Sequence, residues 1–95
     1  MTTWKTPQLK RLARALLSLR AEHDLMNFLR DVGTLEELGE WSRRWEAAQM
    51  IDRGVPYREV AKKTGLSTAT VTRIAHWLRH GEGGYQIALR RRPKR

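Results

Sequence analysis

Apolar residues recur at three- and four-residue steps along most of the chain, which is the spacing of one face of an α-helix. The first such segment carries four leucines on one face: Leu9, Leu12, Leu16 and Leu19. Thr6 and Pro7 precede it, combining a good N-cap with proline at the first helical position, where its missing N–H is not needed. A second, shorter helix is expected from about Asp24 to Asp31, ended by Gly33, and three of its side chains should face inward: Leu25, Phe28 and Leu29.

Thr34 and Glu37 form the pattern of a capping box and so predict the start of a third helix. It should run to about Arg53, and Gly54 suits its C-terminal stop. Its apolar side carries five residues: Leu38, Trp41, Trp45, Ala48 and Ile51. Two tryptophans on one helix of so small a protein belong either to an ordinary core or to a dimer interface, since one thin layer of helices cannot easily cover both rings.

Two further helices follow, separated by a short turn. Val55-Pro56 opens the first, expected over about 56–63, and the turn runs through Lys63-Thr64-Gly65-Leu66. Ser67 is placed to cap the second, expected over about 68–80. The stretch 81–84 then breaks the pattern, and residues 85–95 should form a short tail. Because no segment shows the alternation of a strand, the chain is predicted to be all-α.

The region 56–80 matches the pattern of a helix-turn-helix. This motif needs a small side chain in its first helix where the second crosses it, and Ala61 lies there. It also needs a residue free to take a left-handed conformation at the turn, and Gly65 follows four positions later. Four apolar residues are spaced to lock the second helix onto the first: Val60, Leu66, Val71 and Ile74. Together these positions predict a helix-turn-helix.

Charge is distributed unevenly along the chain, whose formal net charge is +9. Residues 1–54 hold 9 basic and 8 acidic side chains, whereas residues 55–95 hold 10 basic and 2 acidic ones. This division fits an assembly part joined to a polyanion-binding part, although a solvated basic surface would have the same composition. We therefore divide one domain into a helical dimerisation and core region (1–54), a helix-turn-helix region that binds DNA (55–84) and a basic C-terminal tail (85–95).

Composition argues against several classes of protein. The absence of cysteine rules out disulfides and thiolate metal sites. No apolar run approaches the roughly 18 residues of a membrane span, and the N-terminus does not resemble a signal peptide, so we expect a cytoplasmic protein. His76 and His80 have a spacing that can hold a metal, but no third ligand is evident and no metal is expected. Nothing resembles a nucleophile–base pair or a phosphate-binding glycine loop, so we expect neither an enzyme nor a cofactor.

The N-terminal turns of the motif's second helix are the part that meets base edges. Five side chains there are candidates for base reading: Ser67, Thr68, Thr70, Thr72 and Arg73. Their hydroxyls can bond bases or phosphates, threonine methyls can meet thymine methyls, and arginine can grip guanine. Four basic side chains are candidate phosphate contacts: Arg58, Lys62, Lys63 and Arg79. The arginine-rich end of the chain either follows the DNA backbone or a minor groove, or is simply disordered.

The stretch from Leu38 to Tyr85 resembles the Trp repressor superfamily, and more closely its YerC/YecD-type branch. The residues that carry the resemblance are Tyr57-Arg58-Glu59-Val60-Ala61, Gly65, the run from Ser67 to Arg73, and the later Gly83-Gly84-Tyr85. Members of the family are intertwined all-α homodimers that bind palindromic operators. The resemblance therefore implies a homodimer of this chain, with its two helix-turn-helix units projecting toward double-stranded DNA.

The Trp repressor itself holds its tryptophan corepressor between two arginines, and the resemblance places Arg43 and Arg73 at those positions. Two other positions depart from the family pattern: Ile74 replaces a glycine that makes space beside the ligand's ring, and Trp77 replaces a serine near its amino group. These larger side chains should fill the space with the protein's own atoms. We therefore expect Arg43 and Arg73 to bind phosphates or support the reading helix, and no tryptophan to bind.

The sequence thus predicts a sequence-specific transcriptional regulator, a repressor that binds a palindromic operator as a dimer without a corepressor. Two alternatives remain: a helix-turn-helix module used for protein–protein assembly, and a tryptophan-dependent repressor.

Overall fold

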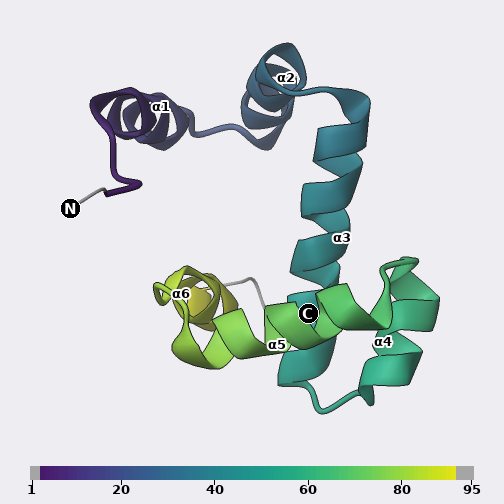
Figure 1. Cartoon of the computed structure of the whole chain (residues 1–95). Coiled ribbons are helices and arrows are strands. Elements are labelled where there is room, and N and C mark those ends of the chain that lie inside the picture. The colour runs from purple at the N-terminus through teal and green to yellow at the C-terminus, as the bar shows by residue number, and fades with distance from the viewer. Residues whose placement is uncertain (1–2, 92–95) are drawn as a thin grey trace. The chain divides into compact units, whose positions relative to one another are not determined.

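The computed structural model describes residues 3–91, and within them the chain consists of six α-helices and no strand (Figure 1). In chain order the helices are α1 (Pro7–Ser18), α2 (Glu22–Val32), α3 (Leu35–Asp52), α4 (Tyr57–Thr64), α5 (Thr68–His80) and α6 (Gly84–Arg91). The predicted all-α class is confirmed. None of these helices is both long enough and apolar enough to cross a lipid bilayer.

Side-chain caps form the predicted starts of α1 and α3. Thr6 Oγ1 accepts a hydrogen bond from the Leu9 backbone N–H at 3.1 Å, with proline at the first position of α1. At the start of α3, Thr34 Oγ1 accepts from the Glu37 N–H at 3.0 Å, and the Thr34 N–H donates to Glu37 Oε1 at 2.8 Å. Each cap satisfies backbone donors that the first turn of a helix leaves without partners, so both predicted signals are confirmed.

The second helix begins two residues earlier than expected. It starts at Glu22, after an Ala21 cap that makes no side-chain hydrogen bond. Glu22 and Asp24 both lie in its first turn, where the helix dipole favours carboxylates, so Asp24 is an early helical residue instead of the start. Three side chains of α2 were expected to face inward, Leu25, Phe28 and Leu29, and each is half-buried. No side chain of α2 is fully buried in the single chain.

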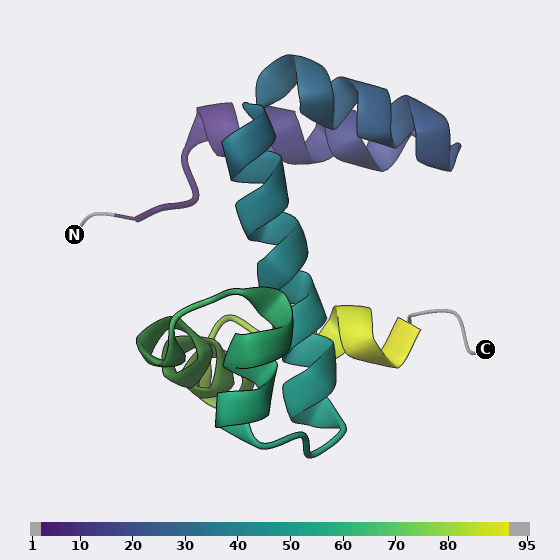
Figure 2. The same ribbon diagram turned by 90° about the vertical axis from the view of Figure 1, so that its right-hand side faces the viewer.

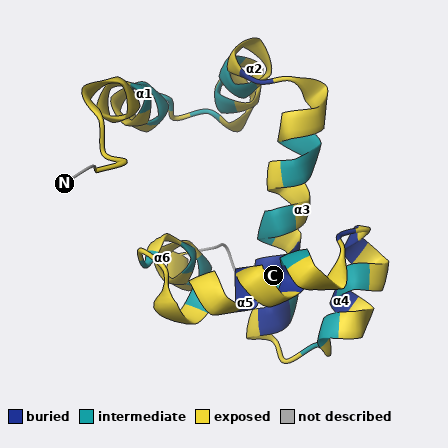
Figure 3. Cartoon of the chain, in the orientation of Figure 1, coloured by how far each residue is buried: buried dark blue, intermediate teal, exposed yellow. Residues whose placement is uncertain are grey.

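The chain forms two compact units, Met1–Leu38 and Gly39–Arg95. In the first unit, α1 and α2 are amphipathic, yet neither buries a side chain. Large apolar side chains stay open to solvent on them, among them Leu17 at 82% and Met26 at 62% exposure. Figure 3 shows both helices in yellow and teal. One copy of the chain therefore gives the first unit no core of its own.

The second unit holds the hydrophobic core, where the C-terminal half of α3 meets α4 and α5 (Figures 2 and 3). The core residues are Ala47, Ala48, Ile51, Val60, Leu66, Val71, Ile74 and Ala75. Ala47 and Ala48 are fully buried, and their small side chains let α5 run close across α3. The two tryptophans of α3 differ: Trp45 packs against this core, whereas Trp41 remains 48% exposed.

The expected C-terminal tail is helical through Arg91, as α6, which corrects the prediction for residues 85–91. Tyr85 and Leu89 lie one turn apart and are both half-buried, and the Tyr85 ring stacks on Trp45 with centroids 6.5 Å apart. Burial raises the pKa of the Tyr85 hydroxyl, and the positive charge of Arg44 partly opposes that rise. Residues 92–95, for which DNA contacts or disorder were predicted, lie outside the described residues.

Gly65 takes the left-handed conformation that the sequence predicted, with φ 80° and ψ 4°. An added Cβ would meet no atom within 4 Å, so the effect of Gly65→Ala comes from the backbone alone. We expect this variant to lower the free energy of unfolding by about 1–2 kcal/mol in urea titrations. Gly84→Ala is the control, since Gly84 has open space and no positive φ. An equal decrease in the free energy of unfolding for the two variants would show that the turn does not require a left-handed residue at position 65.

Candidate nucleic-acid interface

The turn between α4 and α5 is held by local hydrogen bonds. The Gly65 N–H closes α4 by donating to the Ala61 carbonyl at 2.9 Å. Thr64 is buried in the turn, where its Oγ1 donates to the Val60 carbonyl at 2.8 Å and accepts from the Leu66 N–H at 3.2 Å. Sequence reasoning missed Thr64, although a threonine next to a turn commonly bonds the nearby backbone.

The apolar residues predicted to fasten α5 to α4 are confirmed as core. Val60, Val71 and Ile74 are fully buried, and Leu66 is 8% exposed. Ala61, expected at the crossing, is half-buried and packs against the edge of the core. Since the inner face of α5 is fixed in this way, its opposite face is left open to solvent.

The N-terminal turns of α5 present polar side chains on that open face. Ser67 caps the helix, and its Oγ accepts from the Thr70 N–H at 3.1 Å. Of the five side chains predicted to read bases, Ser67, Thr68, Thr72 and Arg73 are exposed, and Thr70 is half-buried. The group therefore lies at one helix end and is accessible, as a surface that meets base edges must be.

Four of these five side chains also form hydrogen bonds within their own helix or its cap. Ser67 Oγ donates to Thr70 Oγ1 at 3.0 Å, and Arg73 Nη2 donates to the same oxygen at 3.2 Å. Thr72 Oγ1 donates to the Thr68 carbonyl at 2.9 Å. The hydroxyls at 67, 70 and 72 thus have internal partners before any ligand arrives.

Basic side chains lie on both helices that carry the reading surface, by which we mean the polar N-terminal end of α5 at residues 67–73. Arg58, Lys62 and Lys63 line a shallow concavity on the exposed face of α4 together with Glu59. Lys63 Nζ pairs with Glu59 Oε2 at 3.1 Å, so the unopposed positive charges there are those of Arg58 and Lys62. Arg79 is exposed at the far end of α5. It follows Thr68 by eleven residues, about three helical turns, so the two share a face of the helix.

At the positions that the resemblance assigns to a corepressor, Ile74 is fully buried and Trp77 is 39% exposed. The guanidinium over the Trp77 ring, 5.7 Å from its centroid, is that of Arg44, a residue that sequence reasoning did not single out. Arg43 instead pairs with Glu40 at 3.4 Å and lies against Gly39. Arg43 and Arg73 are therefore each engaged on their own helix.

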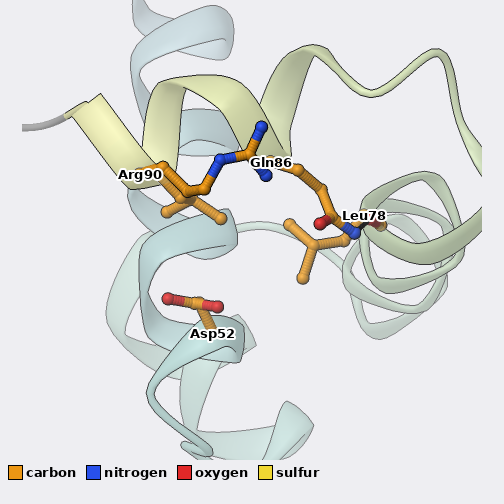
Figure 4. Close-up of a pocket in the computed structure, with 5 residues that line it drawn as sticks. Asp52, Leu78, Gln86 and Arg90 are labelled. Atoms are coloured by element: carbon orange, nitrogen blue, oxygen red, sulfur yellow. Dashed lines mark hydrogen bonds between the residues drawn. The ribbon is translucent and has the colours of Figure 1, made fainter.

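Hollows also lie at the other end of α5. One, of about 250 Å³, is lined by Leu78, Gln86 and Arg90, with Asp52 on its far side (Figure 4). Gln86 Nε2 donates to the Leu78 carbonyl there at 2.7 Å, joining α6 to α5. Another, of about 700 Å³, has a mostly aromatic wall of Trp45, Trp77 and Tyr85, and it also holds His76 and His80. Across residues 3–91, no group of three potential ligands could hold a metal ion.

Comparisons with known proteins agree on one family. The family model described as Trp repressor protein matches residues 7–93. An uncharacterised protein, YerC of Bacillus subtilis (strain 168), is 33% identical over 84 residues, covering 88% of this chain and 81% of that protein. The crystal structure of a TrpR-like protein from Eubacterium eligens ATCC 27750 superposes with a TM-score of 0.86 at 37% identity, covering 92% of this chain and 90% of that one.

Proposed function

Because the chain belongs to the Trp repressor protein family, whose fold it shares, we propose that it is a DNA-binding transcriptional regulator that acts as a repressor through α4 and α5. The observation that carries this proposal is the open N-terminal end of α5, where Thr68, Thr72 and Arg73 are exposed on a helix whose opposite face is buried. This end belongs to the strongly basic half of the chain, as binding to a polyanion requires.

Each protomer would place residues 67–73 in one major groove of double-stranded DNA. The exposed side chains of that segment would contact base edges, and Arg58, Lys62, Lys63 and Arg79 would contact phosphates on either side. Arg43, which pairs with Glu40 on α3, would bind a phosphate or support the reading helix. Under this proposal residues 55–84 bind DNA, residues 1–54 assemble the protein, and residues 85–95 add positive charge.

A homodimer is the second part of the proposal. In one copy no side chain of α1 or α2 is fully buried, and Trp41 and Leu35 are 48% and 67% exposed. Exposing so many large apolar side chains is costly in water, and a second copy would cover them. A dimer would also present two reading helices, which suits a palindromic operator.

The salt dependence of DNA binding tests the proposed phosphate contacts. Lys62→Ala should lower affinity for all duplex sequences and reduce the slope of log K against log salt by about 1, since one counterion fewer is released. Fluorescence anisotropy with a labelled duplex in a salt series would measure this. Lys10→Ala, at an exposed position of α1, should leave the slope unchanged. Equal slopes for wild type and Lys62→Ala would contradict the role given to Lys62.

The same assay separates DNA binding from the protein-assembly alternative. The wild-type protein should bind duplex DNA at submicromolar concentration in low salt, with affinity falling steeply as salt rises. Absence of binding below micromolar concentration in low salt would favour a module whose open α5 face packs on a protein.

We expect regulation without tryptophan, because Ile74 and Trp77 occupy positions that are small in the tryptophan-binding repressor. Millimolar tryptophan should leave the thermal unfolding midpoint unchanged, since only a ligand that prefers the folded state raises it. Differential scanning fluorimetry, with millimolar leucine as the control, would measure the midpoint. A rise caused by tryptophan alone would support the tryptophan-dependent alternative.

A further inference from the structure

Thr70 is the residue of the reading surface whose hydroxyl oxygen already accepts two hydrogen bonds from within the protein. Its Oγ1 accepts one hydrogen bond from Ser67 Oγ and another from Arg73 Nη2, at 3.0 Å and 3.2 Å. A hydroxyl oxygen has two acceptor lone pairs, so both are engaged inside the protein. The side chain is also half-buried, unlike its neighbours Thr68 and Thr72. Thr70 is thus better placed to hold Arg73 than to touch a base.

Arg73 is held in a defined position by this contact. The bond to Thr70 spans three residues toward the N-terminus, so it draws the guanidinium back toward the end of α5 that carries Ser67 and Thr68. Within residues 3–91, Arg73 pairs with no carboxylate. The bond uses one of the five N–H donors of a guanidinium, which leaves donors for the O6 and N7 acceptors of guanine.

Thr72 offers its methyl group more readily than its hydroxyl. Its Oγ1 donates its only hydrogen to the Thr68 carbonyl at 2.9 Å, a bond within the helix. The side chain is nevertheless exposed. With the hydroxyl hydrogen committed inside the helix, Thr72 cannot donate to a base, and apolar contact with the thymine methyl is the readout that its methyl group offers in the major groove.

We propose that each reading helix recognises a guanine and a thymine within one half-site, the guanine by Arg73 and the thymine methyl by Thr72, with Thr70 positioning Arg73. This inference rests on the proposed DNA-binding function. It narrows the five candidate base-reading residues to two that discriminate between bases. Ser67 and Thr70 organise the helix end, and Arg73 and Thr72 carry the discrimination.

Base analogues in an operator selected by the wild-type protein test the two contacts from the DNA side. Replacing the contacted thymine with uracil removes only the methyl group and should weaken binding about fourfold. Replacing the contacted guanine with 7-deazaguanine removes the N7 acceptor and should weaken binding roughly tenfold. Wild-type binding that tolerates every such replacement in the half-site would overturn this inference while leaving the DNA-binding proposal intact. No binding to any duplex would overturn both.

Variants at position 72 identify the protein methyl as the partner of the thymine methyl. Thr72→Ser keeps the hydroxyl and loses the methyl, so it should bind the thymine operator about fourfold more weakly and no longer distinguish uracil from thymine. Thr72→Val keeps a methyl and loses the hydroxyl, and it should still distinguish them. The reverse pattern, with Thr72→Ser sensitive to uracil and Thr72→Val insensitive, would contradict the methyl contact.

Thr70→Val tests the positioning role. Valine preserves the shape and the backbone N–H that bonds to Ser67, but it removes the oxygen that holds Arg73. This variant should keep the wild-type melting temperature yet discriminate guanine from 7-deazaguanine several-fold less well, and Thr70→Ser should restore the discrimination. Full discrimination by Thr70→Val, or failure of Thr70→Ser to restore it, would show that Thr70 does not act through Arg73.

Discussion

Leu16→Asp is expected to convert the protein from a dimer into monomers. Operator binding should weaken by about 10²- to 10⁴-fold, because linking two DNA-binding units in one dimer raises affinity by about that factor. Leu16 lies in the middle of the apolar stripe of α1, on a helix that buries no side chain in a single copy. An aspartate there places a charge where a second copy would pack. Size-exclusion chromatography with light scattering should give twice the 11.1 kDa chain mass for the wild type and a single chain mass for the variant.

Ser18→Asp is the matched control for this experiment. It adds the same charge to the same helix, on the face opposite the leucine stripe, and Ser18 is exposed. We expect it to remain dimeric and to bind DNA as the wild type does. Circular dichroism should show similar helix content in the two variants. A wild-type protein that is monomeric at micromolar concentration, or a Leu16→Asp variant that stays dimeric, would contradict the dimer proposal.

Arg73→Ala is expected to weaken binding to the selected operator by roughly 5- to 150-fold, the discrimination usual for an arginine bound to guanine. Non-specific binding to random duplex should change far less, because it depends on phosphate contacts elsewhere on α4 and α5. Competitive electrophoretic mobility shift assays with both DNAs would measure the ratio of operator affinity to random-duplex affinity.

The control for Arg73→Ala is Arg14→Ala, which removes the same charge from an exposed position on α1. It should leave the ratio of specific to non-specific affinity unchanged. Equal operator affinities for wild type and Arg73→Ala would show that another residue reads the operator.

Much of this fold could be predicted because its signals are local. Thr34 and Glu37 cap a helix through residues three apart, and the bonds found between them are those that the pattern predicted. Gly65 and the buried residues around it act over a few turns of chain, so the helix-turn-helix followed from spacing alone. The polar end of α5 could be located for the same reason.

The features that escaped prediction depend on contacts between helices or on rotamers. Arg44 and Arg43 are adjacent in the sequence, and only the packing of α3 on α5 decides that Arg44 lies over Trp77. The helix α6 follows two glycines and an acidic residue and itself begins with a glycine, and contacts such as Tyr85 on Trp45 fasten it to α3. Thr70 could not be separated from Thr68 and Thr72 by residue type, because the distinction lies in which oxygen accepts the Arg73 hydrogen bond.

If an accessible helix end, carried twice by a symmetric pair of chains, reads DNA, the protein must select particular duplexes. Selection of bound duplexes from a random library, followed by sequencing, would reveal that preference. We predict enrichment of a palindrome whose half-sites are centred about 34 Å apart, one turn of the double helix. Recovery of a pool with the same sequence distribution as the starting library would show that the protein does not read DNA sequence.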